Sequence, residues 1–250
     1  MTIPLICAHR GASANYPENT LRSFIKALEQ RADALEIDVR QTRDGHLVAC
    51  HDFNLSRLTG AHVSLSEIDL REFKKLRIKN LEPPASIDEI FSEVGTTPRI
   101  VLDIKENRLE KKILALIAEH KLEGNMILSS FDPRILANLK RLNPEIKTAL
   151  IAGPLSLLPL AVNVCFYLRK VSEYANCDYL HLHYMNILYP GYHTLAGWGY
   201  KISYWTVDYP RDIRHVISLN AEQIITNRPG LARAILDRSR RHARFDPDSH

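Results

Sequence analysis

Short apolar runs alternate with amphipathic segments along nearly the whole chain. In residues 19–30, for example, apolar side chains recur at the i, i+3, i+4 and i+7 positions of a helix that packs one face against a core. Such an alternation is typical of strands and helices that follow one another in a parallel sheet. We predict strands at residues 5–9, 34–39, 100–105, 126–130, 147–152, 178–183, 202–207 and 223–226.

This pattern of strand–helix repeats, without an internal linker or a change in composition, favours one closed (β/α)8 TIM barrel over residues 1–237 rather than a doubly wound sheet. The alternation is interrupted once, after the second strand. There, residues 41–98 are predicted as an insertion with a tight turn, an extra strand at 47–51 and a helical stretch at 65–76. An insertion at this point lies over the carboxyl ends of the barrel strands and can shape a substrate pocket.

Capping residues mark several predicted helix starts. Asn19 or Thr20 can cap the helix over residues 19–30, and Asp132 precedes a first-turn proline. Residues 86–89 match a capping box. At the other end of the chain, residues 238–250 are polar and rich in arginine, so we predict a disordered tail there.

The net charge indicates which class of partner the protein binds, and the cysteines indicate its cellular compartment. A formal net charge of +4, from 33 basic and 29 acidic residues, is too small and too mixed to indicate nucleic-acid binding, so a small-molecule partner is favoured. The four cysteines are scattered without metal-site or redox spacing, which fits a reducing compartment. No secretory signal precedes the first strand, and we predict a cytoplasmic protein. The pattern carries no prediction of the oligomeric state.

One apolar segment, residues 155–168, bears on membrane contact. It is shorter than the roughly 20 residues that a spanning helix needs, and Pro159 and Asn163 interrupt it. We favour a buried barrel helix, with contact at a membrane surface as the alternative.

Charged residues gather at the ends of the predicted strands, where barrel enzymes carry their active sites. Glu36 and Asp38 are two positions apart, so both side chains lie on one face of their strand, about 6.6 Å apart along the backbone. Asp103 on the adjacent strand would add a third carboxylate. Such a set favours a hard divalent cation, Mg²⁺ or Ca²⁺, over zinc. The alternative is that Glu36 and Asp38 only form ion pairs with nearby arginines.

Two histidines and two basic residues complete the set. His9 and His51 each end an apolar run, and two histidines across a small site can act as base and acid in turn. Arg10 and Lys105 would supply fixed positive charge for a phosphoryl group, although Lys105 could instead pair with Asp103. Because no serine or cysteine stands out as a nucleophile, the set predicts metal-assisted phosphoryl transfer.

Several motifs resemble the glycerophosphodiester phosphodiesterase family, and together they extend from residue 5 to about residue 235. The specific ones are His-Arg-Gly at 9–11, Pro-Glu-Asn-Thr-Leu at 17–21, Glu-x-Asp-Val at 36–39, Thr-Arg-Asp-Gly at 42–45 and His-Asp at 51–52. Weaker matches follow at residues 102–105, 129–132, 205–207 and 226–229.

The resemblance implies a metal-dependent barrel that cleaves glycerophosphodiesters to sn-glycerol 3-phosphate and an alcohol. It implies attack by a glycerol hydroxyl and a cyclic phosphate that water opens. The implied roles are metal ligation by Glu36, Asp38 and Asp103, acid–base catalysis by His9 and His51, phosphate contact by Arg10 and Lys105, pocket lining by Phe131 and Trp205, and support by Glu18 and Asn19.

The family often has glutamate where this chain has Asp103, which can change the position of the ion. His181 and His183 form a further pair on one strand face, without a predicted role. Two other functions stay open from the sequence: a lysophospholipase D-like activity on lysophospholipids, and a catalytically silent barrel that binds phosphodiesters.

Overall fold

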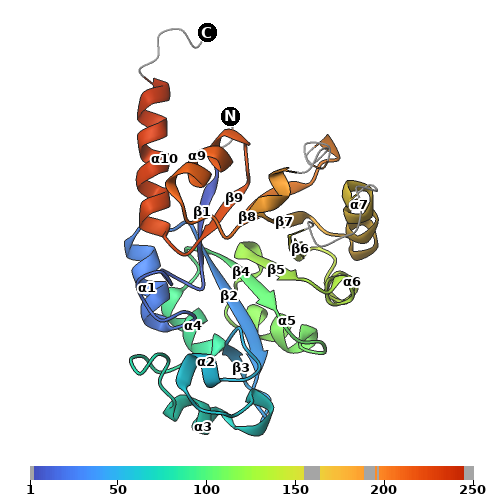
Figure 1. Cartoon of the computed structure of the whole chain (residues 1–250). Helices are drawn as coiled ribbons and strands as arrows, with labels where there is room; N and C mark the ends of the chain where they lie inside the picture. The colour runs from blue at the N-terminus through green and yellow to red at the C-terminus, as the bar shows by residue number, and fades with distance from the viewer. Residues whose placement is uncertain (1–2, 155–163, 189–194, 196, 245–250) are drawn as a thin grey trace.

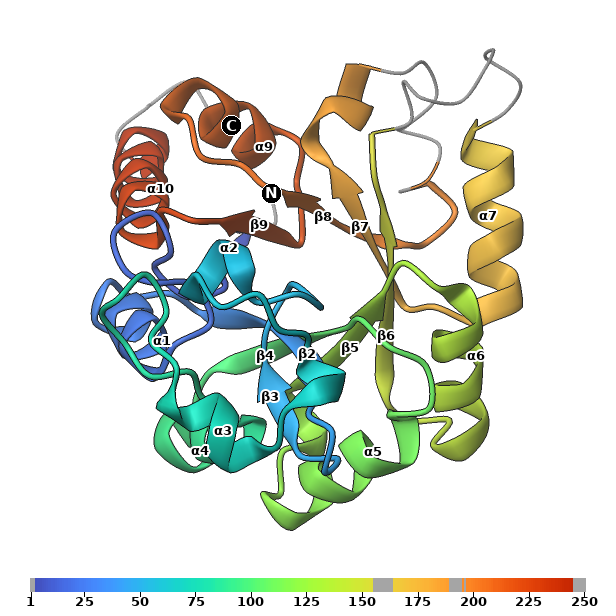
Figure 2. The same cartoon turned by 60° about the horizontal axis from the view of Figure 1, so that its bottom comes forward.

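The parallel strands of the protein form a closed ring, in which β1 pairs with both β2 and β9 (Figure 2). The structure is a computed structural model that describes residues 3–154, 164–188, 195 and 197–244. The strands of the ring are β1 (Leu5–His9), β2 (Ala34–Gln41), β4 (Arg99–Ile104), β5 (Met126–Ser130), β6 (Lys147–Ala152), β7 (Tyr179–His183), β8 (Lys201–Trp205) and β9 (Gln223–Thr226). The predicted TIM barrel is therefore confirmed.

Helices cover the outside of this ring (Figures 1 and 2). They are α1 (Leu21–Glu29), α4 (Ile87–Val94), α5 (Glu110–Glu119), α6 (Pro133–Leu142), α7 (Val164–Ala175), α9 (Pro210–Ser218) and α10 (Pro229–Arg244), and short 3-10 turns occupy Glu123–Asn125 and Tyr184–Leu188. The predicted caps Ser86 and Asp132 accept hydrogen bonds from the first turns of α4 and α6. Thr20 rather than Asn19 caps α1, because its hydroxyl accepts from the backbone N–H of Ser23.

The last helix is longer than the sequence pattern predicted. α10 continues to Arg244, so residues 238–244 are helical and the expected tail is wrong for this stretch (Figure 1). No glycine or proline interrupts residues 231–244, and arginine and alanine favour helices, which explains the extension. Residues 245–250 lie outside the described part of the chain.

The segment between β2 and β4 has a small core of its own. It contains β3 (Leu47–Ala49), α2 (Ser56–Thr59), a 3-10 turn (Leu65–Glu67) and α3 (Leu70–Lys75). β3 runs antiparallel to the end of β2, so the segment begins at the carboxyl side of the barrel. A separate apolar cluster holds it together: Val48, Cys50, Leu55, Leu58, Leu65, Phe73 and Ile78.

Two predictions for this segment need correction. The predicted helix at residues 65–76 is split, because Ser64 and Asp69 each begin a new helical turn with a capping box. The predicted insertion at residues 41–98 also includes α4, whose apolar side chains belong to the main core between the ring and the outer helices. The added elements therefore end before Ser86, and α4 belongs to the ordinary helical layer.

A layer of alternate strand residues fills the barrel interior below the carboxyl ends of the strands. Successive side chains on a strand point to opposite faces, so residues two positions apart point the same way. The interior layer consists of Cys7, Ala34, Val101, Ile127, Ala149, Tyr179 and Ile225, with Trp205 packed against it. Residues two positions further along these strands consequently face the space at the carboxyl ends.

The apolar segment at residues 155–168 can be followed only from Val164, where α7 begins, because residues 155–163 lie outside the described chain. Within α7, Leu168 is buried, whereas Phe166 and Tyr167 are exposed. Among the described residues, no helix has both the length and the apolar character required to cross a bilayer.

Candidate active site

A cavity of about 100 Å³ lies at the carboxyl ends of the strands, and most of the predicted site residues line it. They are His9, Arg10, Glu36, His51, Asp103, Lys105, Phe131 and Trp205. Glu18, Asn19 and Asp38 are also buried. Glu18 and Asp38 contact Arg10 of this lining, and Asn19 contacts Asp38. Strand alternation thus brings the predicted residues to one place.

The lining has a charged half and an uncharged half. Its acidic and basic residues all come from the first 105 positions of the chain. The opposite half, from β5 to β9, contributes Ser129, Ile151, His181 and Ile225 beside the two aromatic rings. Burial lowers the pKa of His181 to about 3, so this imidazole is neutral in the folded protein.

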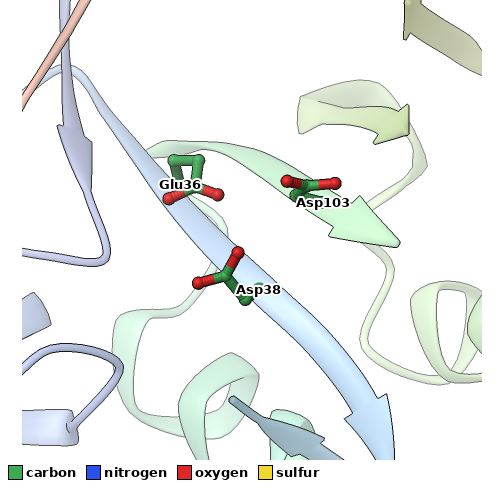
Figure 3. Close-up of side chains that lie close together, drawn as sticks. All are labelled: Glu36, Asp38 and Asp103. Atoms are coloured by element: carbon green, nitrogen blue, oxygen red, sulfur yellow. The ribbon is translucent and has the colours of Figure 1, made fainter. Parts of the chain in front are cut away.

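Three carboxylates converge on the charged half (Figure 3). Glu36 and Asp38 lie on one face of β2, and Asp103 on β4 pairs in register with Asp38. One oxygen from each carboxylate lies within 4.8 Å of the others. The spacing and the oxygen donors therefore suit a divalent cation.

Two basic side chains offset part of this negative charge. Lys105 Nζ lies 2.8 Å from Asp38 Oδ1 and also pairs with Asp103, while Arg10 Nε lies 3.0 Å from Asp38 Oδ2. Burial raises the pKa of Asp38, but Lys105 and Arg10 outweigh burial and hold it below its usual range. Asp38 is consequently a carboxylate between two cations.

The other two carboxylates lack sufficient positive charge. Burial, then repulsion by Asp38 and Asp103, raises the pKa of Glu36 well above its usual value. Burial also raises the pKa of Asp103 to about 6, against the opposing effect of Lys105. Among the described residues, no hydrogen-bond donor reaches the buried Oδ1 of Asp103. A divalent cation would supply both the missing charge and a partner for this oxygen, so the residues fit such an ion.

The hydrogen bonds of His9 determine which of its nitrogens carries the proton. The Asn227 side-chain N–H donates to Asp208 over 2.6 Å, so its carbonyl oxygen faces His9 Nδ1 at 2.8 Å. His9 Nδ1 is therefore the donor, and Nε2 keeps a free electron pair. Burial, then the nearby charge of Arg10, lowers the pKa of His9 to about 4. A neutral His9 can accept a proton at Nε2.

His51 has a different partner. Its Nδ1 lies 2.7 Å from a carboxylate oxygen of Asp52, which can only accept, and its side chain is 39% exposed against 16% for His9. Burial raises the pKa of Asp52, but hydrogen bonds from Arg57 and His51 outweigh it and lower the pKa. The Asp52 carboxylate holds the ring through Nδ1, so Nε2 of His51 is left for proton exchange at the cavity.

Glu18 and Asn19 support the charged half from behind. Glu18 binds the Arg10 guanidinium over 3.0 Å, and the Asn19 side-chain N–H donates to Asp38 Oδ2 over 2.8 Å. Asn19 has a positive φ of 56°, a conformation that asparagine tolerates better than most residues. It therefore contacts a carboxylate of the cluster instead of capping α1.

The aromatic rings stand on the uncharged half. Phe131 and Trp205 meet edge to face at 5.8 Å, and His183 meets Trp205 in the same way at 5.1 Å. Lys105 Nζ lies 5.8 Å from the centre of the Phe131 ring, so one aromatic side chain borders the charged half. Phe131 is 51% exposed and faces the entrance of the cavity rather than the barrel core.

Three residues that bind the predicted site residues were not predicted from the sequence. Asn227 contacts His9, Asp52 contacts His51, and Arg57 binds both Asp52 and Glu18. Asn227 and Asp52 lie within the motifs at residues 226–229 and 51–52, so their place in these motifs could have identified them. None of the sequence motifs includes Arg57.

Gly11 allows the chain to turn closely around Arg10. Its φ is +84°, and an added Cβ would lie 2.4 Å from Ser23 Oγ and 2.6 Å from the Ser23 backbone carbon. We expect Gly11→Ala to destabilise the fold by about 2–4 kcal/mol, through the unfavourable φ and the overlap together. Urea unfolding measures this loss.

Gly60→Ala is the matched control for that variant. Gly60 has a similar φ of +76°, but no atom lies within 4 Å of the added Cβ. It should therefore lose only the conformational part, about 1–2 kcal/mol. Equal losses in the two variants would contradict the close approach of Gly11 to Ser23.

The sequence of this chain is similar to those of several known proteins. The model of the glycerophosphoryl diester phosphodiesterase family matches residues 9–231. A glycerophosphodiester phosphodiesterase of Caldanaerobacter subterraneus subsp. tengcongensis is 32% identical over 240 residues, which cover 90% of this chain and 94% of the relative. A mouse lysophospholipase D is 26% identical over 274 residues, which cover 93% of this chain and 82% of the relative.

Solved structures give the same result for the fold. The structure of an Oleispira antarctica phosphodiesterase in complex with the product sn-glycerol 3-phosphate superposes with a TM-score of 0.79. It is 25% identical, and the match covers 94% of this chain and 97% of the other.

Proposed function

Because the chain belongs to the glycerophosphoryl diester phosphodiesterase family, we propose that it hydrolyses glycerophosphodiesters to sn-glycerol 3-phosphate and an alcohol with the help of one divalent cation, Mg²⁺ or Ca²⁺. One observation carries the proposal. His9 and His51, held by different partners, border the same cavity as a carboxylate cluster and two fixed cations. These are the groups that cleavage of a phosphodiester requires.

Glu36, Asp38 and Asp103 would hold the cation. When bound, the ion polarises a phosphoryl oxygen and stabilises negative charge in the transition state. Arg10 and Lys105 add donors on the same side, and their ion pairs with Asp38 limit their movement. The chain thus offers a positively charged clamp for the phosphate.

We assign the roles of the two histidines in the first step from their different hydrogen-bond partners. His9 Nε2 accepts the proton of the glycerol 2-hydroxyl, whose oxygen attacks phosphorus. His51 donates a proton to the departing alcohol, and Asp52 holds the ring in position through Nδ1. The product is a cyclic phosphate. In the second step the roles reverse, and water opens the ring to sn-glycerol 3-phosphate.

The remaining predicted residues line the cavity or hold the proposed phosphate and metal ligands in place. Phe131 and Trp205 would line the site against the carbon skeleton of the substrate, because they form the apolar part of the cavity. Glu18 and Asn19 would hold Arg10 and Asp38 in place. None of these side chains exchanges a proton with the substrate.

The test is release of sn-glycerol 3-phosphate and of the alcohol from several glycerophosphodiesters, with and without added Mg²⁺ or Ca²⁺. We expect turnover of glycerophosphocholine or glycerophosphoethanolamine that depends on the ion. Cleavage of lysophosphatidylcholine without cleavage of glycerophosphocholine would replace the proposal by the lysophospholipase D alternative. Binding without turnover of any diester would favour the silent barrel.

A second prediction tests the cyclic intermediate. A substrate that lacks the glycerol 2-hydroxyl should bind with similar affinity but turn over at least about 10²-fold more slowly, because it has lost the neighbouring nucleophile with its high effective concentration. Competition with the normal substrate measures binding, and alcohol release measures turnover. Normal turnover of the deoxy analogue would show that water attacks phosphorus directly.

A further inference from the structure

Arg57 binds two carboxylates that belong to different parts of the molecule. It lies in α2 (Ser56–Thr59) of the added segment, and it is not part of the cavity lining. Its Nε binds Asp52 over 2.5 Å, while its Nη1 and Nη2 bind both oxygens of Glu18 over 3.0 and 2.8 Å. One guanidinium thus connects the loop after β3 with the loop after β1.

Each of these carboxylates continues to a residue in the cavity. The other oxygen of Asp52 binds His51 Nδ1 over 2.7 Å, and Glu18 Oε1 also binds Arg10 over 3.0 Å. The five side chains form an unbroken series of hydrogen bonds with Arg57 at its centre. Displacement of Arg57 therefore affects the proposed acid and the proposed phosphate ligand together.

The guanidinium suits this position for a geometric reason. Its donors lie in one plane at fixed angles, so it holds the two carboxylates at a fixed separation and orientation. A lysine ammonium carries the same charge but has no such fork. Glu18 is 8% exposed, so its ionised form depends on these hydrogen bonds more than a surface carboxylate would.

We propose that Arg57 is a positioning residue that fixes His51 and Arg10 relative to each other, so that the added segment completes the active site. This inference rests on the proposed function, because it assigns His51 as the acid for the leaving alcohol. Arg57 does not touch the reacting atoms. Its effect passes through Asp52 and Glu18.

The two arms of the series predict different kinetic effects. A misplaced His51 slows the departure of an alcohol that needs a proton, such as choline, but not of p-nitrophenol, which leaves as a stable anion. A misplaced Arg10 weakens phosphate binding for every substrate. Loss of Arg57 should therefore lower kcat for the choline ester but not for the p-nitrophenyl ester, and it should raise KM for both. A purely structural defect does not produce this combination.

The experiment compares Arg57→Ala with the unmodified protein on glycerophosphocholine and glycerophospho-p-nitrophenol, in single turnover so that only cleavage of the ester is observed. We expect the rate for the choline ester to fall by about 10-fold to 10²-fold and the rate for the aryl ester by no more than about 3-fold. KM should rise for both substrates. Arg57→Lys should keep the melting temperature but not the rate for the choline ester.

Arg43→Ala is the matched control. Arg43 belongs to the same added segment and is similarly exposed, at 54% against 50%, but its side-chain partners within the described part of the chain are Glu67, Asp69 and Glu72, which lie outside the site. It should keep near-normal kinetics for both esters.

Two outcomes would overturn the inference. Equal losses for both esters in Arg57→Ala, or unchanged kinetics in Arg57→Lys, would show that Arg57 contributes only stability or charge. A double substitution with His51→Ala gives an independent test, because Arg57→Ala should then cause little further loss in kcat for the choline ester. Failure of the proposed function itself is distinguishable, since the unmodified protein would then cleave neither ester.

Discussion

Removal of divalent cations is expected to lower the rate of diester hydrolysis by more than about 10³-fold, and Mg²⁺ or Ca²⁺ should restore it. The physical reason is the unbalanced charge of the cluster, in which Glu36 and Asp103 have raised pKa values and Asp103 Oδ1 accepts no hydrogen bond from the described residues. Chelation followed by metal titration checks the expectation. Full activity of the chelated protein would remove these carboxylates from metal binding.

The same cluster predicts how metal affinity changes with pH. Bound protons compete with the ion, and the pKa of Asp103 is about 6 in the metal-free protein. Affinity should therefore fall as the pH falls through this value. Calorimetric titration with Mg²⁺ or Ca²⁺ at about pH 8 and about pH 5 measures the difference.

Two variants at Asp103 sharpen the test. Asp103→Asn removes the charge and should abolish activity, whereas Asp103→Glu keeps the carboxylate and should retain activity with a changed metal preference. Asp178→Asn is the control, because this carboxylate pairs with Lys140 and Lys147 at the start of β7, at the other end of the barrel. Equal activity losses in all three variants would indicate general destabilisation.

His9→Ala and His51→Ala are each expected to lower kcat by about 10²-fold to 10⁴-fold, as is typical when a general acid or base is lost. The two rings do different work in the proposed reaction, since an amide holds His9 and a carboxylate holds His51. Steady-state assays with glycerophosphocholine measure the loss, and circular dichroism checks the fold.

His120→Ala serves as the control for both histidines. Its ring binds Asp88 over 2.8 Å, as His51 binds Asp52, but the pair lies between α5 and α4 outside the cavity. Its loss should leave kcat within about 2-fold of normal, as expected for a residue remote from the reaction. Near-normal turnover in His9→Ala or His51→Ala would remove that histidine from the mechanism.

The strands of the barrel could be predicted from the sequence because burial on both faces produces continuous apolar runs. Glu36 and Asp38 could be placed together because side chains two positions apart share a strand face. The first residue of a helix was harder to predict where two neighbouring polar residues could each cap it. Asn19 and Thr20 were equivalent candidates for one cap, and only the barrel determines that Asn19 instead meets Asp38.

The supporting contacts could not be predicted in this way. His9 and Asn227 are 218 positions apart, and their hydrogen bond exists because β9 closes the ring beside β1. Arg57 reaches Glu18 across 39 positions through the fold of the added segment. Periodicity specifies which face of an element is buried, but it does not specify which polar groups meet when distant elements close on one another.

The division of the cavity lining into two halves bears on how this enzyme could acquire new specificities. The groups proposed for chemistry come from the first 105 residues, whereas β5 to β9 supply Ser129, Ile151, His181 and Ile225 beside the two aromatic side chains. Substitutions at these lining positions can therefore alter which head group is accepted, while the residues proposed to bind the ion and to act as acid and base stay unchanged. Directed evolution for a new diester can concentrate on these positions and should keep Asn227 and Asp208, because they hold His9. A chimera that joins residues 1–105 of this chain to the later strands of a relative with the same contact to His9 would be expected to inherit its catalysis from one parent and its selectivity from the other.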